Sequence, residues 1–141
     1  MSKKLFSAKL GRQISVFLEN RPGTLSEVID TLRENGINML ALSLSEGLDI
    51  GYLRIIVDQH ECAVDVLRRA GHLVIERDVV LLTVANEPGG LASAVDIWAR
   101  AGINIEYAYS ADDESADKSL IVARVNDIPK ALVVLESALR A

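Results

Sequence analysis

Hydrophobic and polar residues alternate along the chain in two periods, and each change of period marks a change of element. Residues 12–19 carry β-branched and aromatic side chains up to a turn, a pattern typical of a strand. Between residues 25 and 32, apolar side chains recur three, four and seven positions apart, which predicts an amphipathic helix. Thr24 and Glu27 are spaced as a capping box, and Gly36 stands where this helix should end.

The residues that follow complete a small α+β unit. Apolar runs at 37–45 and 51–58 flank a Gly-Leu-Asp-Ile loop and predict a β-hairpin. Residues 61–70 predict a second helix that ends at Gly71, and residues 72–76 predict a fourth strand. The resulting order of elements is βαββαβ.

This unit occurs twice. Residues 20–38 align with residues 86–104 at a constant shift, with eight identities in nineteen positions, where chance would give about one. The identical residues, numbered in the first copy, are Asn20, Pro22, Gly23, Leu25, Asp30, Gly36, Ile37 and Asn38. A period of this length that is present only twice indicates two copies of a small domain rather than a solenoid.

The second copy ends before its fourth strand. We expect a strand at 79–85, a helix at 91–101, strands at 104–110 and 118–125, and a last helix opened near Pro129. The predicted domains are therefore residues 12–77 and residues 78–141, the second lacking its own C-terminal strand. Residues 1–11 form an N-terminal arm that either supplies the missing edge strand or is a frayed terminus.

Each copy brings an Asn-x-Pro-Gly turn to the start of a helix. The first N–H groups of a helix have no internal partner and favour a carboxylate or phosphate, while a glycine lets another group approach the backbone. Asn20 and Asn86 add an amide that can both donate and accept, which suits the carboxylate and ammonium of a free amino acid. The alternative is that these turns serve folding alone.

The segments "ENRPGTLSEVIDTLRENGIN" and "NEPGGLASAVDIWARAGIN" resemble the opening of ACT domains, the βαββαβ modules that sense amino acids in metabolic enzymes. The whole chain resembles the stand-alone tandem ACT proteins of bacteria. This resemblance implies two ferredoxin-like domains side by side, with a continuous antiparallel sheet and helices on one face. It also implies a regulatory protein that binds an amino acid and is not an enzyme.

In ACT modules the ligand is held by the strand-to-helix loop of one domain and the start of the second strand of another. Transferred to this chain, the resemblance implies ligand-binding residues Asn20, Arg21, Pro22, Gly23, Thr24, Leu25, Asn38, Asn86, Glu87, Pro88, Gly89, Gly90, Leu91 and Asn104. Serine-binding members carry a histidine two residues before the first asparagine. Leu18 and Val84 stand there in this chain, which favours an apolar ligand side chain over serine.

Composition and charge limit the kinds of partner and ligand that we expect. A net charge of −5 argues against nucleic acid and anionic membranes, because Lys and Arg supply phosphate affinity. The single cysteine, Cys62, and the short apolar runs predict a cytoplasmic protein. His60, Cys62 and His72 lack the paired spacing of a zinc site, so we expect no metal and no cofactor.

The remaining expectations concern assembly and rival functions. Half of the residues are hydrophobic, which favours burial in a homodimer. A metabolic enzyme is the other expected partner. One rival function is an adaptor that docks such an enzyme without binding a ligand. The other is a phosphate-binding or enzymatic role at the glycine-rich helix starts.

Overall fold

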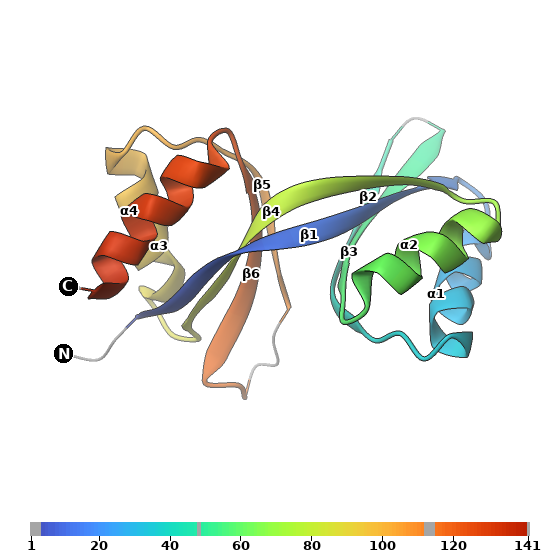
Figure 1. Ribbon diagram of the computed structural model, residues 1–141, viewed down its shortest axis with the longest axis horizontal. Helices are drawn as coiled ribbons and strands as arrows, with labels where there is room; N and C mark the ends of the chain where they lie inside the picture. The colour runs from blue at the N-terminus through green and yellow to red at the C-terminus, as the bar shows by residue number, and fades with distance from the viewer. Residues whose placement is uncertain (1–3, 48, 112–114, 141) are drawn as a thin grey trace. The chain divides into compact units, whose positions relative to one another are not determined.

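The computed structural model describes residues 4–47, 49–111 and 115–140. Residues 1–3 of the expected arm and residue 141 of the second expected domain lie outside this part. The chain forms six strands and four helices (Figure 1). In chain order they are β1 (Leu5–Glu19), α1 (Thr24–Glu34), β2 (Met39–Glu46), β3 (Ile50–Val57), α2 (His60–Arg69), β4 (Leu73–Ala85), α3 (Gly90–Arg100), β5 (Ile105–Ala111), β6 (Lys118–Val125) and α4 (Ile128–Arg140).

The strands are hydrogen-bonded in the order β2-β3-β1-β4-β6-β5. The chain divides into two compact units, and β1 and β4 each contribute residues to both. The first unit is Arg12–Arg77, and the second comprises the described parts of Met1–Gly11 and Asp78–Ala141. The predicted α+β class with two ferredoxin-like domains is confirmed.

The first unit buries one face of its strands beneath α1 and α2. β1 pairs antiparallel with β3, with Ile14 opposite Ile55 and Val16 opposite Leu53. All four of these side chains are buried, and Val28, Leu32 and Leu67 from the two helices pack onto them. Removing each large side chain from water stabilises the fold by roughly 1.5–3 kcal/mol. The apolar residues that follow the helical and strand periods of the sequence therefore pack into one core.

The second unit repeats this core with its own residues. Trp98 of α3 is buried, as its alignment with Leu32 predicts, and its indole N–H donates to the carbonyl of Ala131 in α4 at 3.1 Å. Leu5 of β1 is buried in the same cluster. The backbone N–H of Ala85 donates to the Lys4 carbonyl at 2.7 Å, so the beginning of β1 lies along the end of β4 in this unit.

Two predicted boundaries differ from the structure. We expected separate strands at 72–76 and 79–85, but β4 runs without a break from Leu73 to Ala85. β1 likewise begins at Leu5 instead of residue 12. In β4 the residues between the two expected strands, Arg77 and Asp78, are neither Gly nor Pro, so nothing there forces a break in the extended backbone. β1 continues through Gly11, which stays within the strand.

Candidate functional site

The turn between β1 and α1 is held by backbone contacts around Gly23. Gly23 has a φ of 92°, a conformation that glycine adopts without a steric cost, and it is the N-cap of α1. Thr24 is already the first helical residue, and its hydroxyl donates to the carbonyl of Glu19 at 3.1 Å. The predicted capping box of Thr24 with Glu27 is therefore wrong, because the left-handed Gly23 moves the helix start by one residue.

This turn lines a cavity of about 420 Å³ in the first unit. The predicted residues that line it are Asn20, Arg21, Gly23, Thr24 and Leu25. Leu18 and Glu19 at the end of β1 also line it. The rest of the lining, which the sequence analysis missed, comes from the β2–β3 hairpin: Leu44, Ser45, Glu46 and Gly51. They come close because β1 pairs with β3 so that Leu18 lies opposite Gly51. Working out this strand pairing from the ferredoxin-like order would have found them.

Arg21 is the cation of this region. Its Nε donates to Glu19 at 3.0 Å, and its terminal nitrogens lie 3.3 Å from Glu27. The hydrogen bond to Glu19 and the charge of Glu27 raise the pKa of Arg21 above its usual value. Arg21 also lines a neighbouring cavity of about 360 Å³ that reaches His72. Both signs of charge therefore border these cavities.

Asn38 and Pro22 stand apart from this cavity. Asn38 lines a different cavity of about 360 Å³, at the end of α1, and its backbone N–H donates to the Asp58 carboxylate at 3.0 Å. Pro22 is exposed and does not line the cavity beside Asn20. Asn20 and Asn38 therefore line different cavities of the first unit.

The corresponding turn of the second unit, between β4 and α3, is held more tightly. The side-chain amide of Asn86 donates to the carbonyl of Ala116 at 2.8 Å. Glu87 forms an ion pair with Lys4. A Cβ atom on Gly90 would lie 1.8 Å from the carbonyl oxygen of Ala85, so only glycine fits there.

The other predicted residues of the second unit lie around this turn and at the start of β5. Gly89 is the N-cap of α3 with a φ of 89°. Pro88 and Leu91 are exposed. The backbone N–H of Asn104 donates to the side chain of Asn126 at 2.9 Å.

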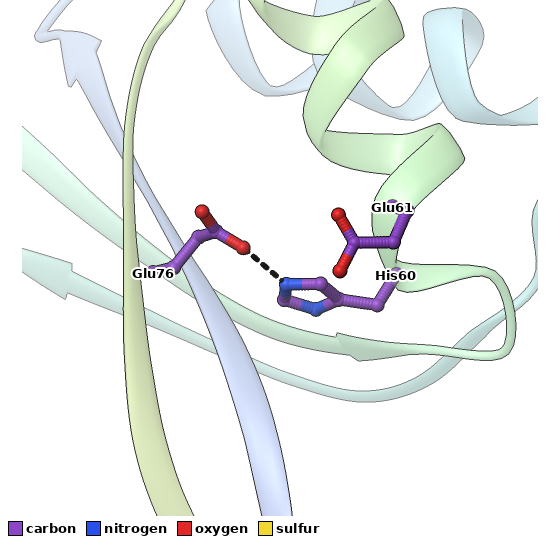
Figure 2. Close-up of side chains that lie close together, drawn as sticks. All are labelled: His60, Glu61 and Glu76. Carbon is purple, nitrogen blue, oxygen red and sulfur yellow. Dashed lines mark hydrogen bonds and ion pairs between the residues drawn. The ribbon is translucent and has the colours of Figure 1, made fainter.

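A group of titratable side chains lies elsewhere in the first unit, where α2 begins (Figure 2). Figure 2 shows the ring of His60 turned toward the carboxylate of Glu76 on β4, with Glu61 beside it. The His60 Nε2 to Glu76 distance is 2.6 Å, and potential ligand atoms of the three residues lie within 4.8 Å of one another. Among the described residues they are the only such group, and it includes neither Cys62 nor His72.

Arg12 pairs with both carboxylates of this cluster. Its guanidinium donates to Glu61 and, at 2.5 Å, to Glu76. The hydrogen bond from His60 is the largest effect on Glu76 and, with the charges of Arg12 and Arg68, holds the pKa of Glu76 below its usual value despite partial burial. We therefore interpret the cluster as a set of ion pairs that ties α2 to β1 and β4.

In the described part of the chain, no helix is both long enough and apolar enough to cross a bilayer.

Comparisons with known proteins place this geometry in a family. The model of the ACT domain pair matches residues 10–140. Protein BT0572 from Bacteroides thetaiotaomicron has a similar crystal structure, with 34% identity, a TM-score of 0.86, and coverage of 93% of this chain and 90% of that one. No match was found among curated proteins.

Two more distant structures share the fold. The ligand-free regulatory subunit of aspartate kinase from Thermus thermophilus is 21% identical, with a TM-score of 0.67 and coverage of 96% of this chain and 99% of that one. Escherichia coli aspartokinase III in complex with lysine and aspartate is 14% identical, with a TM-score of 0.55 and coverage of 99% of this chain and 34% of that one.

Proposed function

Because the chain belongs to the ACT domain pair family, we propose that it is a regulatory protein, not an enzyme, and that it senses a small amino acid. The observation that carries the proposal is the cavity of about 420 Å³ beside the first Asn-x-Pro-Gly turn. The regulatory subunit of aspartate kinase, which shares the fold over nearly its whole length, supports a regulatory role.

The lining of this cavity suits both ends of an amino acid. Asn20 offers an amide and Arg21 a guanidinium to the ligand carboxylate, while Glu46 offers a carboxylate to the ligand ammonium. Leu25 and Leu44 leave an apolar wall for the ligand side chain. The cavity volume lies within the usual range of about 300–1,000 Å³ for small-molecule sites.

The expected affinity is modest, because an amino acid offers few atoms. A few charge-assisted hydrogen bonds, reduced by the cost of ordering the ligand, correspond to a Kd between about 1 μM and 1 mM. The proposal also includes the sequence-based predictions of a homodimer, a metabolic enzyme as partner and a cytoplasmic location.

A thermal-shift screen of amino acids, sugar phosphates and nucleotides tests this function. A ligand that binds only the native state raises the melting temperature. Stabilisation by one or a few amino acids alone is the expected result. Stabilisation by anions in general would favour a phosphate-binding role, and no stabilisation of well-folded protein would favour the adaptor.

A further inference from the structure

The two Asn-x-Pro-Gly turns differ in whether their polar groups are already used by the protein. We infer that only the first turn, Asn20–Leu25, takes the ligand and that the second turn, Asn86–Leu91, is a structural joint. This inference rests on the proposed function and assigns it to one of two turns that the duplication makes equivalent in sequence. The cavity and the side chains around it, not the helix starts alone, carry the argument.

The two asparagine side chains show the first difference. The amide of Asn86 donates to the carbonyl of Ala116 at 2.8 Å, which fastens the turn to the loop before β6. The side chain of Asn20 makes no hydrogen bond to any described residue, and it lines the cavity. A ligand can therefore bind the Asn20 amide without breaking an existing bond, whereas at Asn86 it would have to displace a protein carbonyl.

The first residue of each helix shows the second difference. The backbone N–H of Gly90 donates to the carbonyl of Glu87 at 3.0 Å, and the Ala85 carbonyl fills the space where a Cβ would lie. At the equivalent Thr24, the side-chain hydroxyl and not the backbone N–H contacts the carbonyls of the turn. The hydroxyl oxygen lies 3.1 Å from the carbonyl oxygen of Glu19 and 3.3 Å from that of Arg21, and its one hydrogen can be donated to either. The Thr24 N–H makes no hydrogen bond to the described residues and remains available beside the cavity.

The charge next to each asparagine shows the third difference. Arg21 borders the first cavity with a cation. It already pairs with Glu19 and Glu27, but a guanidinium has five N–H groups, so it can also donate to a ligand carboxylate. Glu87 holds the equivalent position in the second turn, and Lys4 neutralises it through an ion pair. A ligand carboxylate at the second turn would meet Glu87 unless it displaced Lys4, which belongs to the segment that completes this unit.

The test is a titration of the full chain with each common L-amino acid, using ¹⁵N-labelled protein and following backbone amide shifts. Calorimetry with every amino acid that causes shifts then measures Kd and stoichiometry. The matched variants are Asn20→Ala and Asn86→Ala, with Arg21→Ala and Glu87→Ala as a second pair in case Asn86→Ala does not fold. We expect one ligand per chain, with shifts concentrated at 20–25.

The variants separate the inference from the proposed function. Asn20→Ala should raise Kd about tenfold, the equivalent of one lost charge-assisted hydrogen bond, and Asn86→Ala should leave Kd within about twofold. Two ligands per chain, or equal losses from both asparagine variants, would overturn the inference and leave amino-acid sensing intact. If no amino acid shifts any amide of the wild-type chain, the proposed function fails and the inference with it.

Discussion

The carbonyl oxygen of Ala85 lies 1.8 Å from the position that a Cβ atom of Gly90 would occupy. Gly90→Ala must therefore push α3 away from the end of β4, and we expect it to lower the free energy of unfolding by about 2 kcal/mol or more. Urea denaturation measures this free energy, and the fluorescence of Trp98, the only tryptophan, reports on the unfolding of the second unit, to which Gly90 belongs.

Gly51→Ala is the matched control for this substitution. A Cβ on Gly51 would meet its nearest neighbour, the Ser45 carbonyl oxygen, at an ordinary 3.7 Å. We expect this variant to be neutral or slightly stabilised, because alanine reduces the entropy of the unfolded chain. Gly51 belongs to the first unit, which does not contain Trp98, so the unfolding of this variant is followed by circular dichroism. Equal effects of the two variants would contradict the close contact at Gly90.

The two asparagines of the turns should also differ in their contribution to stability. Asn86→Ala removes the hydrogen bond to the Ala116 carbonyl and should lower the free energy of unfolding by about 1 kcal/mol. Asn20→Ala removes an exposed side chain that bonds to no described residue and should leave stability unchanged. Urea denaturation of both variants without ligand measures their free energies of unfolding. A loss for Asn20→Ala equal to or larger than that for Asn86→Ala would contradict the difference between the two turns.

The first strand should contribute to the core of the second unit through Leu5. Leu5 is 7% exposed, and replacing it with alanine leaves a cavity that should cost about 2 to 3 kcal/mol. Leu10 lies on the same strand but is 54% exposed, so Leu10→Ala should cost well under that amount. Trp98 fluorescence during urea denaturation compares the two, and similar small losses would mean that the beginning of β1 is not part of this core.

The ion-pair cluster at the start of α2 predicts a pH-dependent contribution to stability. The pKa of Glu76 is lowered in the folded protein, chiefly by the hydrogen bond from His60 and then by Arg12. A carboxyl group with a depressed folded pKa stabilises the protein fully above its ordinary pKa of 4.5, and this contribution is lost as the pH falls through the folded pKa.

Glu76→Gln should therefore unfold at lower denaturant concentration than the wild type at neutral pH. The difference should begin to shrink below pH 4.5 and disappear once Glu76 is protonated in the native state. Circular dichroism during urea denaturation across this range measures the difference. Glu34→Gln, at an exposed position of the same unit, is the control. A difference that is constant with pH would mean that Glu76 acts through its shape and not its charge.

Local patterns in the sequence were sufficient for most elements, while the candidate site depends on contacts that no local pattern contains. The apolar period around Val28 and Leu32 predicted α1, because the burial of one helix face requires it. Leu44 and Glu46 of β2 reach the cavity because β2 pairs with β3 and β3 pairs with β1, which joins residues far apart in sequence. The hydrogen bond from the Asn86 side-chain amide to the Ala116 carbonyl is likewise a contact between residues far apart in sequence. Two turns that are alike in sequence therefore differ in structure.

The last prediction concerns which asparagines act together on a ligand. Asn20 and Asn38 line different cavities of the first unit, so their effects on binding should be additive, and Asn38→Ala should leave the affinity of the first turn unchanged.

Calorimetry on the full chain, with Asn20→Ala, Asn38→Ala and the double variant, measures the coupling energy. Residues that share a ligand typically couple by about 0.5 to 3 kcal/mol, whereas independent residues add within about 0.5 kcal/mol. Coupling between Asn20 and Asn38 would contradict their separation in the first unit. Full additivity of Asn20 and Asn38 would mean that the first turn binds its ligand without the start of β2.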